Sequence, residues 1–411
     1  MKIRVFFISK NMIQKTLSTL LLALFISYLG LAQTNLSPER LARYDAYFQN
    51  EIDQGKLPGV ITLVYKNGEK VHESALGVSN ISTQAPMKSD QIFYIQSMTK
   101  PIITTAFMML YEEGHFFLND PLHKYLPEFK DAQVAKDPEL GSEGGLEPLK
   151  SPITLAQLMS HTAGFSHGLG SSKVDKEVIE GLYYTAHPDI ATRVSAYAKL
   201  PMIGQPGEQW YYSATPDILA GLIEVISGKN PAEFLQERLF GPLGMKDTGY
   251  NLNEEQNQRM VTLHSYDEQG KLIVAERQTP TSGNTIFAGA NALFSTAHDY
   301  SLFARMMLNG GEWEGKRYLS SKTVELMTLP HDDGLFLDPG KGFGFGFAVI
   351  DDLADTKALG SEGTFYWSGA YCTYFFIDPK EDLVAIFMTQ VSPFSSYYEN
   401  RFRQMIYQAV E

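Results

Sequence analysis

Segments with strand character lie at both ends of the chain and enclose a long middle in which helical patterns dominate. Near the start, β-rich segments at Val60–Tyr65 and Lys70–Leu76 flank Asn67-Gly68, a dipeptide typical of a tight hairpin turn. Strand character returns only late in the chain, at residues 343–350, 366–377 and 383–390. Because the backbone groups of a strand must be paired, these distant segments predict one antiparallel sheet built from both chain ends.

Helices are predicted at both ends of this sheet-forming part. After Ser37-Pro38, a pair typical of a helix start, apolar residues recur at helical spacing at Leu41, Tyr44, Phe48 and Ile52. A second amphipathic helix is predicted over Tyr397–Ala409. The predicted fold class is α+β, with an antiparallel sheet flanked by terminal helices and a large, mostly helical inserted region. We place the domain at residues 33–411, its α/β part at about 38–97 and 306–411, and its helical part at about 98–305.

The first 32 residues have the pattern of a secretory signal peptide. Basic residues without any acid precede an apolar stretch over Leu17–Leu31, and small residues end it at Gly30-Leu31-Ala32. This stretch is shorter than the roughly 20 residues that a spanning helix needs. We therefore predict cleavage after Ala32, export to the periplasm or the medium, and no stable membrane anchor. Both Met1 and Met12 remain possible starts of the signal.

Composition excludes several classes of site and partner. A single cysteine among 411 residues excludes an intramolecular disulfide and a multi-cysteine metal centre. A net charge of −13, without a long Lys/Arg run, argues against a nucleic-acid partner. His161 and His167 have no carboxylate or thiol beside them in a ligand pattern, so we predict no metal site. No cofactor is predicted, and the oligomeric state is left open.

One serine lies in a G-x-S-x-G pattern, Gly164-Phe165-Ser166-His167-Gly168. In α/β-hydrolases this pattern is a nucleophile elbow, which follows a strand and precedes a helix. Here the preceding residues, 153–159, carry apolar side chains at helical spacing, and the following residues are typical of a loop. We therefore interpret the motif as a Gly/Ser loop rather than as the nucleophile.

The motif Ser97-Met98-Thr99-Lys100 offers a second nucleophile. In a helix starting here, positions i and i+3 share one face, which places the lysine amine beside the serine hydroxyl. A serine hydroxyl needs an adjacent base, and an amine can serve when burial lowers its pKa. Taken alone, the motif fits equally an ordinary helix start with an exposed lysine.

Further motifs follow in a recognisable order. Tyr212-Ser213 comes after Pro206-Gly207-Glu208, and we place Trp367-Ser368-Gly369 at the start of a late strand. With His161–Gly164, Tyr212–Gly228, Pro242–Gly249 and Ile377–Lys380, the chain resembles the class C-like branch of the serine β-lactamase and penicillin-binding protein superfamily over about residues 38–409. Within it, the chain is most similar to the β-lactamase-like carboxylesterases. This resemblance implies a β-lactamase/DD-peptidase-like fold.

The resemblance also implies roles for particular residues. Ser97 corresponds to the acylated nucleophile, Lys100 to its base or proton relay, and Tyr212 to a third catalytic residue whose phenol pKa Lys100 would lower. The backbone N–H groups of Ser97 and Ala370 would form the oxyanion hole, next to Trp367-Ser368-Gly369. For Tyr212 and Trp367, simple aromatic packing remains the alternative. We place Cys372 on the same strand, as a small packed residue.

Two departures from the β-lactamase pattern concern the substrate. Tyr212-Ser213-Ala214 stands where those enzymes carry Tyr-x-Asn, so the side-chain amide is absent. Trp367-Ser368-Gly369 stands where they carry Lys-Thr-Gly, so the lysine charge is absent there. A carboxylate-bearing substrate would lose a contact typically worth about 1.5 to 3 kcal/mol, whereas an uncharged ester would lose nothing.

We therefore predict a serine hydrolase that cleaves a small ester, a carboxylesterase, through an acyl-enzyme intermediate. The first alternative is a β-lactamase or D-Ala-D-Ala carboxypeptidase. The second is a non-catalytic, penicillin-binding-like module that binds a ligand. In each case the expected partner is a small-molecule ester or β-lactam-like compound.

Overall fold

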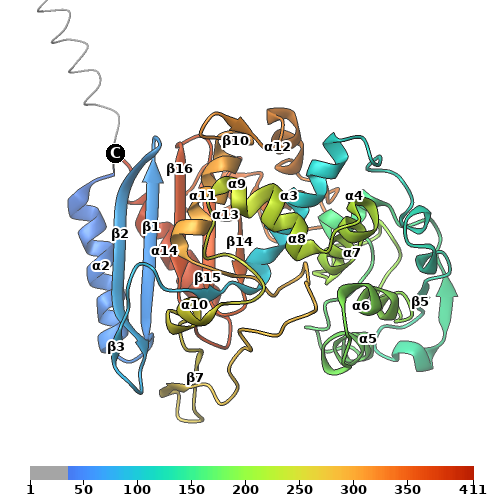
Figure 1. The fold of residues 1–411 in the computed structure, drawn as a ribbon, viewed down its shortest axis with the longest axis horizontal. Coiled ribbons are helices and arrows are strands. Elements are labelled where there is room, and N and C mark those ends of the chain that lie inside the picture. The colour runs from blue at the N-terminus through green and yellow to red at the C-terminus, as the bar shows by residue number, and fades with distance from the viewer. Residues whose placement is uncertain (1–35) are drawn as a thin grey trace, which may run out of the picture.

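Strands from both ends of the chain pair in one eight-stranded sheet in the computed structural model, which describes residues 36–411 (Figure 1). The strand order is β12-β13-β14-β15-β16-β1-β2-β3. At the join, β1 (Gly59–Lys66) pairs antiparallel with β16 (Leu383–Met388). The predicted antiparallel sheet from both chain ends is confirmed.

The late strands form hairpins where the sequence predicted longer single segments. Residues 343–350 and 366–377 each contain a turn, and left-handed backbone in these turns, φ 82° at Gly346 and φ 63° at Cys372, reverses the chain. Cys372 therefore lies in a turn and not on a strand, and Trp367-Ser368-Gly369 ends a strand instead of starting one. The remaining strands of the sheet are β2 (Glu69–Asn80), β3 (Ala85–Pro86), β12 (Lys341–Phe343), β13 (Ala348–Ile350), β14 (Phe365–Gly369) and β15 (Thr373–Asp378).

The two terminal helices pack on one face of the sheet, as predicted. They are α2 (Pro38–Asp53) and α14 (Ser396–Tyr407), which also contact each other. Phe48 of α2 and Phe402 of α14 both pack on Phe387 of β16, with ring centroids 5.1 and 5.3 Å apart. The buried aromatic layer between helices and sheet thus ties the first helix to the last.

The opposite face of the sheet is covered by the mostly helical region, which lies beside the sheet in Figure 1. Its helices are α3 (Thr99–Glu112), α4 (Leu155–Ser160), α5 (Lys173–Ile179), α6 (Ile190–Tyr197), α7 (Thr215–Ser227), α8 (Pro231–Leu235), α9 (Gly241–Leu243), α10 (Glu254–Gln258) and α11 (Ala297–Leu308). Two short helices follow, α12 (Ser321–Met327) and α13 (Leu353–Thr356). Small two-stranded ladders join β4 (Phe93–Tyr94) to β9 (Phe294–Ser295), β5 (Gln133–Ala135) to β6 (Leu146–Pro148), β7 (His264–Tyr266) to β8 (Leu272–Val274), and β10 (Glu312–Trp313) to β11 (Lys316–Arg317).

The inner boundary that we predicted near residue 305 falls inside α11, and the division into two parts stays a prediction. The predicted signal segment, residues 1–32, lies outside the described residues. Between residues 36 and 411, no helix combines the length and the apolar character needed to cross a membrane.

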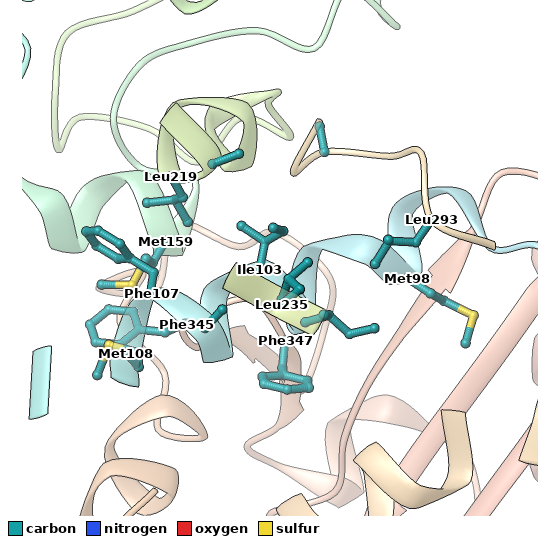
Figure 2. Close-up of a cluster of buried hydrophobic side chains, with 14 of the residues drawn as sticks. Met98, Ile103, Phe107, Met108, Met159, Leu219, Leu235, Leu293, Phe345 and Phe347 are labelled. Atoms are coloured by element: carbon teal, nitrogen blue, oxygen red, sulfur yellow. The ribbon is translucent and has the colours of Figure 1, made fainter. Parts of the chain in front are cut away.

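Helix α3 runs through the main hydrophobic core and is buried from Thr99 to Leu110. Figure 2 shows Ile103 and Phe107 of this helix among apolar side chains from the helical region and from the loop before β13. A helix that is buried all round is held rigidly by its neighbours. The start of α3 is therefore a fixed point in the fold, and it carries the Ser-x-x-Lys motif.

Candidate active site

Ser97 and Lys100 lie side by side at the start of α3. Ser97 sits in a 3₁₀ turn over Gln96–Met98 that leads directly into the helix. The Lys100 Nζ is 3.3 Å from Ser97 Oγ and donates a 2.8 Å hydrogen bond to the carbonyl of Ala290. Lys100 is 1% exposed, so the alternative of a helix start with an exposed lysine is wrong. Burial lowers the Lys100 pKa to about 7, which leaves a neutral amine available near neutral pH.

The end of β14 comes close to this turn. A Cβ added to Gly369 would lie 2.4 Å from the Ile95 carbonyl oxygen, closer than two such atoms can pack. Only glycine permits the strand to approach the Ser97 turn so closely. This explains why the Trp367-Ser368-Gly369 motif ends in glycine.

Tyr212 completes the group. The Lys100 Nζ lies 4.5 Å from the centre of the Tyr212 ring, which also packs on Trp367 at 5.5 Å. The sequence predicted that Lys100 would lower the phenol pKa, but the pKa is raised to about 12. Burial is the main cause, and the neighbouring Ser97 and Trp367 side chains offset it only in part. The phenol is thus protonated near neutral pH and is a proton donor.

The predicted site residues are brought together around one cavity of about 550 Å³, with Lys100 directly beneath Ser97. Besides Ser97 and Tyr212, its wall contains Trp367, Ser368, Gly369 and Ala370. Trp367 lines the cavity and also packs edge-on against Phe343 at 5.1 Å, so its aromatic packing is confirmed and its contact with a substrate stays a prediction. The catalytic and oxyanion roles of these residues remain predictions.

Two histidines hold Tyr212 in place, and the sequence analysis missed this role. The His167 ring stacks on Tyr212 at 5.2 Å, and the His161 ring meets it at 5.3 Å. His161 Nδ1 hydrogen-bonds Ser213 Oγ at 2.7 Å. Burial and the nearby Lys100 charge hold both histidine pKa values well below the ordinary range, so both rings are neutral. Within residues 36–411 no cluster of His, Cys, Asp or Glu could hold a metal.

The other candidate serine is part of a loop, as interpreted. Ser166 lies between α4 and α5, without a preceding strand, and its buried hydroxyl donates to Asp175. It does not line the cavity that contains Ser97.

Asp217 on α7 supports the lysine through the backbone, which is a second feature that the sequence analysis missed. Its carboxylate accepts a 2.7 Å hydrogen bond from the Ala290 N–H, and the Ala290 carbonyl accepts from Lys100. Asp217 is 1% exposed and lies 3.1 Å from Arg193, a buried ion pair. The Asp217 charge raises the Lys100 pKa and so opposes the effect of burial. An acid near the start of the mostly apolar segment 215–223 was the available signal.

We expect Asp217→Asn to shift the acid limb of the kcat/KM profile to lower pH, with any substrate whose turnover depends on Lys100. Removing the negative charge disfavours protonated Lys100, so the neutral amine persists to lower pH. Asp247→Asn is the control, because it removes a paired aspartate that does not influence Lys100. If the acid limb of the profile stays unchanged in an Asp217→Asn variant that is folded, as cooperative unfolding would show, this role for Asp217 is contradicted.

Comparisons with known proteins agree with this geometry. A family model described as Beta-lactamase matches residues 44–409. Protein Rv1367c of Mycobacterium tuberculosis is 33% identical over 83% of this chain and 88% of its own length. Esterase EstB of Burkholderia gladioli is 27% identical over 85% of this chain and 90% of its own length. Among solved structures, EstCE1, described as a hydrolase with promiscuous acyltransferase activity, has a TM-score of 0.77 at 22% identity and covers 90% of this chain and 98% of its own.

Proposed function

This chain belongs to the β-lactamase family, a family of hydrolases, and from that premise we propose that it cleaves small esters through a Ser97 acyl-enzyme. The observation that carries the proposal is the buried Lys100 amine, 3.3 Å from Ser97 Oγ at the floor of a cavity. Its pKa near 7 suits a general base at neutral pH. The esterase named among the relatives supports this reading of the site.

In the proposed reaction, the Lys100 amine takes the Ser97 hydroxyl proton while Oγ attacks the ester carbonyl carbon. The bond between the carbonyl carbon and the alcohol oxygen then breaks, and the Tyr212 phenol donates a proton to the leaving alkoxide. The Lys100 ammonium then returns a proton to Tyr212. This step leaves the acyl group on Ser97, with the Lys100 amine neutral and the Tyr212 phenol protonated, as at the start. Water, deprotonated in the same way, releases the acid and restores Ser97.

An ester is favoured over a β-lactam by the wall beside the nucleophile. Trp367 and Tyr212 present aromatic surface there, and Ala214, which follows Tyr212-Ser213, is fully buried and has no polar side chain. An uncharged acyl or alkyl group can cover this surface without losing hydrogen bonds to water.

The proposal is tested by comparing substrates and by labelling. We expect a fluorophosphonate to add its mass to the peptide containing Ser97, and kcat/KM for p-nitrophenyl butyrate to exceed that for nitrocefin and for a D-Ala-D-Ala peptide by at least about tenfold. Preference for nitrocefin or the peptide would favour the first alternative. Folded protein that takes no label would favour the non-catalytic binding module.

A further inference from the structure

The cavity extends past Ser97 along the end of β14 to helix α14. Within the described residues, β13 pairs with β14 only at Phe365 and Tyr366, so the last residues of β14 run on without a β13 neighbour. Successive side chains of a strand point to opposite faces. Trp367 faces Tyr212, while Ser368 lies on the α14 side and the cavity wall includes both. The cavity therefore has a second end, at α14.

Glu399 of α14 lines this second end, and nothing in the proposed reaction uses it. Its Oε1 is buried and has no hydrogen-bond partner among the described residues. A buried carboxylate oxygen without a donor is costly, and such groups are normally paired. Burial raises the Glu399 pKa to about 7, although Ser368, Lys341 and Arg403 each lower it. Ser368 hydrogen-bonds the same carboxyl, but the buried Oε1 has no donor of its own, and the cavity presents it as an acceptor.

The charges around Glu399 indicate what kind of donor fits. Arg403 is 6% exposed and lines the same end, and Lys341 lies there beside Asp338 at 3.1 Å. Two cations already face the carboxyl, so a substrate ammonium would meet their repulsion. A substrate carboxylate has no proton to donate to Oε1 and would meet the Glu399 charge. A neutral hydroxyl group donates to Oε1 without either penalty.

The remaining wall of the cavity is more apolar. Leu169 and Phe394 line it while remaining 67% and 46% exposed, and Phe336 and Trp367 add aromatic surface. A chain of methylene groups fits this surface. The cavity therefore matches a molecule that has an apolar chain and carries a hydrogen-bond donor.

We propose that Glu399 forms a subsite that accepts a hydrogen bond from a hydroxyl group at the far end of the ester substrate. This inference rests on the proposed function and narrows its substrate class to hydroxylated esters with an apolar spacer. Glu399 is then a specificity-determining residue that does not take part in bond cleavage.

The test compares p-nitrophenyl esters of ω-hydroxy, ω-methoxy and ω-carboxy acids with seven to ten carbons, which are too long to cyclise readily, at pH 8.5, where the Glu399 carboxyl is ionised. At the best chain length we expect the hydroxy ester to exceed the methoxy ester in kcat/KM by about ten- to a hundredfold. Glu399→Ala should reduce this ratio to near one, and Glu399→Gln, which keeps a neutral acceptor, should give an intermediate ratio. Glu325→Ala, an exposed glutamate on α12, should leave the ratio as in the wild type.

A calorimetric measurement separates this inference from the proposed function. N-methyl amides of the same hydroxy and methoxy acids cannot be turned over by an esterase, so their binding reports on the subsite alone. Stronger binding of the hydroxy amide, lost in Glu399→Ala, would support the subsite even if no ester were hydrolysed. Equal binding of both amides, an unchanged ratio in Glu399→Ala, or a preference for the carboxy ester would overturn it.

Discussion

Replacing Ser97 by alanine is expected to lower kcat/KM for p-nitrophenyl butyrate by more than about a thousandfold. Without Oγ there is no atom to form the acyl-enzyme, and water would have to attack the ester directly. The fold should persist, because Ser97 is small and α3 is held by its apolar contacts. Stopped assays at several enzyme concentrations, together with the thermal unfolding temperature, measure both effects.

Ser166→Ala is the matched control for this variant. Ser166 is the other serine in a hydrolase-like motif, it is also buried, and it lies outside the cavity. Its loss should destabilise the loop by removing the hydrogen bond to Asp175, by about 1 to 3 kcal/mol, but should leave fluorophosphonate labelling of Ser97 intact. Retention of most activity in Ser97→Ala, or loss of labelling in folded Ser166→Ala, would contradict the assignment of the nucleophile.

The sheet could be predicted from sequence because its signals are local. The Asn67-Gly68 turn and the apolar segments near residues 343–390 indicate which parts of the chain are strands. In the terminal helices, apolar residues recur about every 3.6 residues. The turns that divide 343–350 and 366–377 into hairpins were not predicted, and the reason lies in single residues. Cys372 adopts a left-handed conformation that is uncommon for a residue other than glycine, and no propensity scale flags it.

The sequence predicts the site only where one short motif contains several of the side chains that form it. The spacing of Ser97 and Lys100 places them on one helix face whatever the rest of the chain does. Asp217, by contrast, reaches Lys100 through Ala290, a residue 73 positions further along the chain. The residues of such a contact lie far apart in the sequence, and no local pattern links them. Only the packing of α7 on α3 brings them together.

The pKa of Tyr212 shows a similar limit. From sequence, a lysine beside a phenol predicts a lowered pKa, because positive charge favours phenolate. In the structure, burial outweighs that effect, and the lysine itself loses part of its charge for the same reason. The sign of the shift depends on solvent exposure, which is a property of the folded chain. In the proposed reaction this gives a division of roles, in which Lys100 accepts protons and Tyr212 donates them.

This division predicts a strong effect of Lys100 on activity and on its pH dependence. Below about pH 7 the Lys100 amine is protonated and cannot take the Ser97 proton, so kcat/KM of the wild type should fall about tenfold for each unit of pH below the pKa. Above that pH the amine is neutral and the profile should be level. Lys100→Met removes the base while keeping a side chain of similar shape, and it should lower kcat/KM by about a hundredfold or more.

Two further variants decide whether the amine acts as a base. Lys100→Arg keeps a cation that cannot be deprotonated, so it should be as inactive as Lys100→Met at every pH. Lys66→Met is the control for burying a methionine in place of a buried lysine, because Lys66 bonds Glu381 outside the cavity. It should keep the wild-type profile. Activity in Lys100→Arg comparable to the wild type would mean that the positive charge, and not proton transfer, is what Ser97 needs.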